Sequence, residues 1–131
     1  MRHLAIGWVL VACSTAAMAD WVKVAESMDG MASHYVDPAT LRRAGAQMQV
    51  VTLTDYRGAQ AISDTQRFRS VKMRDEFNCT DRTGRHLSLV ALADAMGTGP
   101  VVATEERPAP VRAITPGSAD EDVWRHVCGK Q

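Results

Sequence analysis

The 131-residue sequence has three cysteines, no net charge and one long apolar run. Its 15 Lys and Arg residues balance 15 Asp and Glu residues, so charge gives no reason to expect binding to nucleic acid or to an anionic membrane surface. The apolar run, residues 4–12, ends well short of the about 20 residues that a transmembrane helix needs. The composition is that of a globular protein.

Catalytic and cofactor motifs are also missing. No G-x-S-x-G nucleophile elbow occurs. The glycine-rich segment 97–100 lacks the lysine and the following helix of a phosphate-binding loop, so it is interpreted as a turn. We therefore expect no catalytic residue, no cofactor and no enzyme activity.

The histidines do not form a metal motif. His34, His86 and His126 are scattered, and none has a second ligand at the i+2, i+3 or i+4 spacing typical of zinc sites. We expect no metal site and three unrelated surface histidines. A small hydrolase or metal enzyme remains the third hypothesis, which would need a histidine and a carboxylate to meet in one cleft.

The N-terminus has the three parts of a secretory signal peptide. A positive start is followed by the apolar run and by an A-x-A ending at Ala17–Ala19, which predicts a leader of residues 1–19 with cleavage after Ala19. Leu10–Cys13 also resembles a lipoprotein box, in which Cys13 would carry lipid. We favour cleavage after Ala19 and expect an exported protein of the periplasm or cell surface, or an outer-membrane lipoprotein if Cys13 is lipidated.

Residues 20–131 then form one domain of ordinary size. Removing Arg2 leaves 14 basic against 15 acidic residues, a net charge near −1. The remaining cysteines, Cys79 and Cys128, are expected to form a disulfide in an oxidising compartment. Two free buried thiols are the alternative.

Strand patterns dominate this domain. Alternating, β-branched segments between turn signals predict short strands, bounded by turns at Asp29-Gly30 and Thr83-Gly84 and by a polar loop over 57–64. Asp75 interrupts the apolar face of its strand and is interpreted as a strand end or bulge. The expected strands are 21–27, 34–37, 48–56, 67–79, 87–93 and 101–104.

Two helical segments are expected. Asp37 and Pro38 match the cap and first position of a single helical turn over 37–43. Ser118 and Glu121 match a capping box at the start of a C-terminal helix that Gly129 ends. Strands followed by one terminal helix indicate an α+β domain: a small antiparallel sheet of about five or six strands, with the helix packed on it and pinned by the disulfide.

One segment is densely basic. It contains Arg67, Arg69, Lys72 and Arg74, with Arg57 nearby. A patch for an acidic partner or glycan is one interpretation, and a solvated strand whose long side chains cover their neighbours is the other. Because both faces of the strand carry charge, we favour the second.

Seven segments and one cysteine carry a family resemblance: residues 21–27, 34–43, 51–56, 70–72, 76–79, 96–99 and 115–118, together with Cys128. Across residues 20–128 these segments resemble the surface-adhesin protein E family of bacterial envelope proteins. The resemblance implies the same sheet, helix and disulfide, and a cell-surface role resembling that of the family's namesake, which adheres to host matrix proteins. Departures at 109–112 and at Asn78 argue against assuming the same ligand surface.

The leading hypothesis is therefore a non-enzymatic, envelope-exposed binding module for a protein or glycan partner. A periplasmic structural or assembly factor with no extracellular ligand is the alternative. The ligand, its binding face and the oligomeric state do not follow from the sequence.

Overall fold

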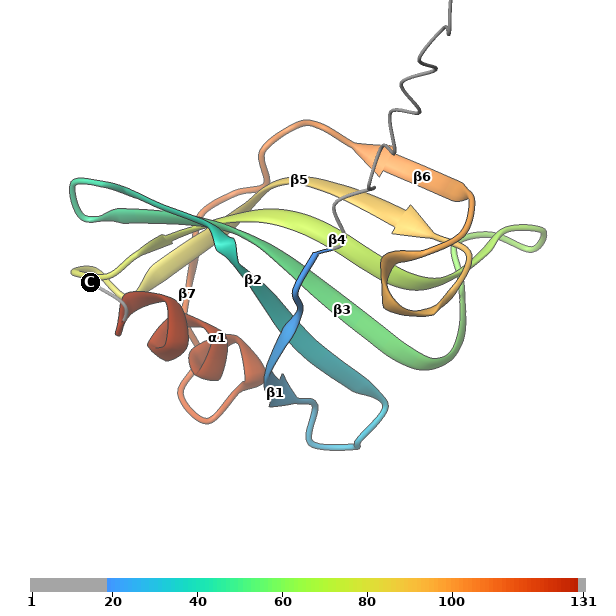
Figure 1. The fold of residues 1–131 in the computed structure, drawn as a ribbon, viewed down its shortest axis with the longest axis horizontal. Coiled ribbons are helices and arrows are strands. Elements are labelled where there is room, and N and C mark those ends of the chain that lie inside the picture. Colours follow the sequence, from blue (N-terminus) through green and yellow to red (C-terminus); the bar gives the residue numbers. More distant parts are fainter. Residues whose placement is uncertain (1–18, 130–131) are drawn as a thin grey trace, which may run out of the picture.

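The computed structural model describes residues 19–129, in which one helix packs against an antiparallel sheet (Figure 1). The predicted α+β class and the terminal helix are confirmed. The predicted leader falls almost entirely in residues 1–18, outside the described residues, as does Cys13, and cleavage after Ala19 stays a prediction. The elements are β1 (Val22–Glu26), β2 (Ala32–Ala44), β3 (Gln47–Ala61), β4 (Arg67–Asn78), β5 (Thr83–Leu92), η1 (Ala95–Gly97), β6 (Val101–Glu105), β7 (Arg112–Ala113) and α1 (Ala119–Cys128).

The strands β1 to β6 lie side by side in chain order, each antiparallel to the next, and β7 pairs with the start of β5. We call the face on which α1 packs the inner face. Successive side chains of a strand point to opposite faces, so Met48 and Val50 of β3 lie together under α1. The core contains Ala25, Val36, Met48, Val50, Phe77, Ile114, Val123, Val127 and Cys128.

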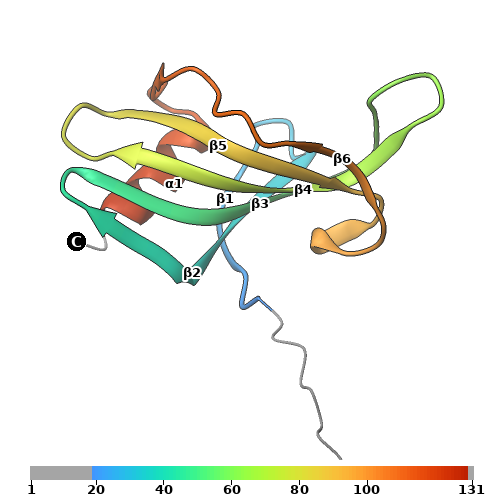
Figure 2. The same ribbon diagram turned by 90° about the horizontal axis from the view of Figure 1, so that it is seen from above.

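The helix covers only part of this face. Figure 2 shows α1 behind the strands at one end of the sheet, while the hairpin between β3 and β4 projects at the other end. Within residues 19–129, no helix has the length and apolar character needed to cross a bilayer.

A disulfide holds the end of α1. Cys79 follows β4 directly and is bonded to Cys128, the last residue of α1, with 5.5 Å between their Cα atoms. One turn earlier, the Trp124 indole Nε1 donates a hydrogen bond to the carbonyl oxygen of Asn78 at 3.1 Å. The helix is therefore fixed at the end of β4, as the sequence predicted.

The start of α1 is capped as predicted on one side only. The backbone N–H of Glu121 donates to the Ser118 hydroxyl at 3.1 Å. The Glu121 carboxylate, however, accepts from the backbone N–H of Gly117 at 3.3 Å, and its other oxygen pairs with Arg82. The Gly117 bond, with Arg125 and Arg82 nearby, lowers the pKa of Glu121. Glu121 thus ties the helix to the turn between β4 and β5.

Replacing Ser118 by alanine is expected to lower the free energy of unfolding by about 0.5–2 kcal/mol, because the N–H of Glu121 loses its acceptor. Urea titration of the purified protein measures this. Ser118→Asp keeps an acceptor and serves as the control, which should retain most of the stability. Equal losses in both variants would contradict the cap.

The predicted helical turn over 37–43 is wrong, because these residues belong to β2. The polar side chains that suggested a helix instead make hydrogen bonds at an irregularity of the strand. Asp37 Oδ1 accepts from the N–H of Ala39 at 3.1 Å, and the Thr40 hydroxyl donates to the Asp37 carbonyl and accepts from the N–H of Val51. The pairing register shifts between Asp37 and Arg42. Neighbouring β3 completes hydrogen bonds that an isolated turn would have made locally.

Other boundaries also differ from the expectation. The chain turns over residues 79–82, where Arg82 has φ of 54°, and Thr83 and Gly84 already belong to β5. The polar loop predicted from 57 begins only after Ala61, because β3 continues into the hairpin. The short strand β7 was not predicted, since two residues carry no periodic pattern.

Candidate functional site

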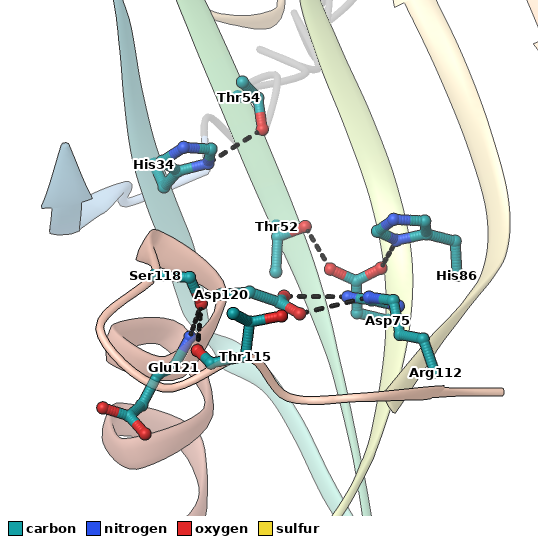
Figure 3. Close-up of polar contacts among 10 residues, drawn as sticks. All are labelled: His34, Thr52, Thr54, Asp75, His86, Arg112, Thr115, Ser118, Asp120 and Glu121. Carbon is teal, nitrogen blue, oxygen red and sulfur yellow. Dashed lines mark hydrogen bonds and ion pairs between the residues drawn. The ribbon is translucent and has the colours of Figure 1, made fainter. Parts of the chain in front are cut away.

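Polar side chains converge on the inner face beside the start of α1, around a cavity of about 420 Å³ (Figure 3). They come from five strands and the helix. We call this the polar cleft. Its polar residues are His34 of β2, Thr52 and Thr54 of β3, Asp75 of β4, His86 of β5, Arg112 of β7 and Asp120 of α1.

Asp75 organises the centre of the cleft. Its side chain is 6% exposed, and both carboxylate oxygens are occupied. Oδ1 lies 2.5 Å from His86 Nδ1, and Oδ2 accepts from the Thr52 hydroxyl at 2.8 Å. The second ring nitrogen of His86 points away from the carboxylate (Figure 3). Asp75 therefore fixes the orientation of an imidazole that is itself about one third exposed.

The position of Asp75 follows from the strand that carries it. The pairing of β4 with β5 shifts register between Arg74 and Asp75, which confirms the bulge interpretation. The shift places Asp75 opposite His86 on the inner face. The sequence signal for this site was a charged residue, Asp75, among the alternating apolar positions of its strand. The sequence did not identify the residues that Asp75 contacts.

His34 lies across the cleft, half-buried, with its Nδ1 3.1 Å from the Thr54 hydroxyl. Burial lowers the pKa of His34 below its ordinary 6.5, and the nearby carboxylates of Asp120 and Asp75 offset part of this effect. The neutral imidazole therefore predominates at pH 7, where it can donate or accept a hydrogen bond.

The stability of the protein is expected to fall with pH below about 6.5 because of His34. In the unfolded chain this histidine binds a proton near its ordinary pKa of 6.5, whereas the folded state binds it only at lower pH. The contribution of neutral His34 to stability is thus fully present above pH 6.5 and is lost as pH falls through the pKa of the folded state. Urea titrations between pH 7.5 and 5 should show a smaller loss for His34→Gln than for the unchanged protein.

The comparison with His34→Gln isolates this histidine, because His86 and His126 are the same in both proteins. The carboxyl groups whose pKa values are lowered, such as those of Asp29 and Glu121, have ordinary values of 4.5 or less and release their protons below the pH range used. An identical slope in both proteins would contradict the assigned burial of His34.

Arg112 connects the sheet to the helix. Its Nε and Nη2 donate to the two carboxylate oxygens of Asp120 at 3.1 and 2.8 Å, a bidentate pair. Its Nη1 is buried without a hydrogen-bond partner, the one such side-chain atom found in residues 19–129. A buried unpaired donor costs about 1–3 kcal/mol, which the bidentate pair with Asp120 offsets. No sequence signal distinguished Arg112.

The expectation of three unrelated surface histidines is wrong for His34 and His86, and the condition set for the hydrolase hypothesis, a histidine and a carboxylate in one cleft, is met by His86 and Asp75. His34 and His86 share one cleft with carboxylates, while His126 lies on α1 beside a separate, mainly apolar pocket. Within residues 19–129, no three His, Cys, Asp or Glu side chains are grouped to hold a metal ion. The hydroxyls of Thr52 and Thr54 are both engaged. A partner in the cleft would therefore be met by the second ring nitrogens of His34 and His86, whose Nδ1 atoms make the bonds described above.

The inner face continues from the cleft toward β6 as a groove of about 390 Å³ with mainly apolar walls. Thr54, Tyr56, Met73 and His86 line both cavities, so cleft and groove are continuous. The rings of Tyr56 and Phe68 meet edge to face with centroids 5.7 Å apart. We call this second cavity the apolar groove. Its apolar lining comprises Tyr56, Ile62, Phe68, Val71, Met73, Leu89, Ala91 and Ala103.

The basic residues singled out in the sequence do not form one patch. Arg69 donates to the backbone carbonyls of Tyr56 and Arg57 at 3.3 and 3.1 Å, beside the apolar groove. Arg74 instead contacts the Gln49 amide, and the Lys72 side chain lies beside Gly97 of η1. Arg57, Arg67 and Arg69 thus gather on the β3–β4 hairpin, apart from the other two.

The sequence model of the surface-adhesin protein E family matches residues 21–129. The fold is similar to two solved structures of Haemophilus influenzae protein E. One, crystal form II, has a TM-score of 0.66 at 12% identity over 94% of this chain and 98% of that one. The other has a TM-score of 0.65 at 11% identity over 88% and 89%. No curated protein sequence matches the chain.

Proposed function

Because the chain belongs to the surface-adhesin protein E family and is an adhesin-like surface protein, we propose that it binds a matrix protein through its inner face. The binding surface would be the apolar groove together with the adjoining polar cleft. Family membership indicates a non-enzymatic protein, and the proposed role is accordingly adhesion.

The uncovered apolar groove is the observation that carries this proposal. The helix α1 buries the inner face at one end of the sheet, but Phe68, Met73 and Leu89 are left only partly buried. Contiguous apolar surface of this kind marks interaction sites in soluble proteins. Aromatic residues and methionine are enriched at protein–protein interfaces, which favours a protein partner.

The polar cleft would orient the bound partner. Groups fixed by buried hydrogen bonds lose little conformational freedom on binding, and His86 is held in this way by Asp75. A partner that buries an apolar side chain in the groove would meet this imidazole at the groove's edge. Position and hydrogen bonding together would give specificity that apolar contact alone lacks.

The test is binding of the purified exported protein to immobilised collagen, fibronectin and laminin. Saturable binding to at least one, weakened about 10-fold or more by Met73→Lys in the groove, is the expected result. Val111→Lys is the matched control, because Val111 is 62% exposed and lies outside the groove. No saturable binding to any of the three, with the disulfide intact, would contradict the proposal.

The proposal also includes export through the predicted leader and display outside the cell. Protease treatment of intact cells distinguishes this from a periplasmic structural or assembly role. A displayed protein is cleaved by added protease, whereas a periplasmic protein is spared until the outer membrane is opened. Protection in intact cells would favour the periplasmic alternative.

A further inference from the structure

The charged side chains of the polar cleft are paired with other side chains of the domain. The Arg112 guanidinium meets the Asp120 carboxylate in a bidentate pair. Both oxygens of Asp75 are occupied, one by the His86 ring and the other by the Thr52 hydroxyl. A charged ligand would lose hydration in the cleft without meeting a free counter-ion, which is unfavourable. The charge pattern therefore favours an uncharged ligand.

The hydrogen-bonding capacity that remains in the cleft belongs to groups able to donate or to accept. The second ring nitrogens of His34 and His86 are left by the bonds to their Nδ1 atoms, and a ring nitrogen donates or accepts according to its protonation. Tyr56 also lines the cleft, and its phenol hydroxyl both donates and accepts. A ligand hydroxyl has the same two capacities, so it can pair with any of these groups in whichever protonation state they adopt.

Apolar surface lies among these polar groups. Met73 of β4 and Val123 of α1 line the same cavity, and the half-buried ring of Tyr56 lines both the cleft and the apolar groove. A sugar ring has a matching construction, with hydroxyls around its edge and C–H groups on its faces that pack on apolar and aromatic side chains. Polar and apolar walls in one cavity therefore fit a saccharide.

The position and size of the cleft favour an oligosaccharide over an extended peptide. Peptides commonly bind by adding a strand to an open sheet edge, but the cleft lies on the face of β2 to β5, which all have neighbours on both sides. Its volume of about 420 Å³ is within the range of about 300–1,000 Å³ for small-molecule sites. Figure 3 shows His34 and His86 on opposite sides of the cleft, so a ligand that meets both extends across it.

We propose that the polar cleft binds an uncharged oligosaccharide. One sugar hydroxyl would bond to the His86 ring and another to the His34 ring, while the face of a sugar ring would lie on Tyr56. This inference rests on the proposed function and makes it more specific, because a matrix glycoprotein would then be recognised partly through neutral sugar units of its glycans. The fixed orientation of His86 would limit the conformational freedom lost on binding.

The test begins with an array that carries neutral, sialylated and sulfated oligosaccharides, incubated with the purified exported protein. Saturable binding to at least one neutral oligosaccharide is the expected result. The affinity of that oligosaccharide is then measured in solution by calorimetric titration, for the unchanged protein and for variants of the cleft. Saturation-transfer NMR should show that protons on the face of a sugar ring lie against the protein.

His86→Gln should weaken the oligosaccharide about 3- to 10-fold, because the ring nitrogen that faces the ligand is lost. Tyr56→Ala should weaken it about 10-fold or more through loss of the aromatic surface. His126→Gln is the matched control, because it makes the same substitution on α1 beside a separate pocket, and it should leave the affinity unchanged. Circular dichroism checks that each variant is folded, and the two cleft variants test the site independently of each other.

Three results would overturn the inference: no saturable binding to any neutral oligosaccharide, binding confined to sialylated or sulfated ones, or equal losses in His86→Gln and His126→Gln. If a matrix protein binds equally well after enzymatic removal of its glycans, and the cleft variants bind it as the unchanged protein does, this inference fails while adhesion stands. If the neutral oligosaccharide binds as expected and no matrix protein does, the inference stands and the proposed adhesion fails.

Discussion

Replacing both Cys79 and Cys128 by alanine is expected to lower the free energy of unfolding by about 2–5 kcal/mol. The bond closes a loop of 49 residues, for which the chain-entropy model gives roughly 4 kcal/mol through restriction of the unfolded chain. A domain of this size has a net stability of only about 5–15 kcal/mol, so the disulfide accounts for a large share of it.

The measurement is urea unfolding of the unchanged protein and the double variant, each with and without a reductant. Reduction should move the midpoint of the unchanged protein to that of the variant and leave the variant itself unaffected. Replacing both residues avoids a free thiol that could form intermolecular bonds. Coincident midpoints under all four conditions would show that the bond adds no stability.

Replacing Asp75 by alanine is expected to cost about 1–3 kcal/mol in unfolding free energy and to release His86 from its fixed orientation. The buried Thr52 hydroxyl would lose its acceptor, and His86 would lose the carboxylate at its Nδ1. The same variant should weaken partner binding, because the imidazole at the edge of the groove is no longer positioned. Asp75→Asn retains the shape and one acceptor, so a smaller loss is expected.

A double-mutant cycle with Thr52→Val separates these contributions. If Asp75 and Thr52 interact as described, the combined loss in Asp75→Ala/Thr52→Val should be smaller than the sum of the single losses. The chemical shifts of the His86 ring protons report its release independently of stability. Additive losses with an unchanged ring signal would contradict the network.

How much of the candidate site could be predicted differs from residue to residue. Asp75 interrupts the alternating apolar positions of its strand, which marks it as unusual in the sequence. The alternation does not identify the residue that Asp75 contacts. His86, 11 residues later, meets Asp75 only because β5 runs antiparallel to β4 and the register shifts there. Arg112 reaches Asp120 from the two-residue strand β7, which follows a proline-containing loop. A strand of two residues has no periodic pattern from which it could have been predicted. Pairing register, which short patterns do not specify, placed Asp75 opposite His86 and Arg112 opposite Gly84.

Local signals also misled where the sheet supplied competing partners. Asp37 and Pro38 match the start of a helix, yet the chain there stays in β2. The Thr40 hydroxyl accepts a hydrogen bond from Val51 of the adjacent strand, which a helical turn would not have allowed. A single helical turn is costly to nucleate and gains few hydrogen bonds. Antiparallel pairing of this segment with β3 is therefore more stable.

The sequence by itself determined the α+β class, most of the strands, the capped terminal helix and the two cysteines that pin it. Each depends on interactions between residues close in the chain, or on the few cysteines available. Only the tertiary structure decided that α1 covers part of the inner face, that two distant histidines share a cleft with carboxylates, and that an apolar groove continues from that cleft. Those features depend on register, bulges and the coverage of one sheet face, which emerge only when all the strands are paired at once.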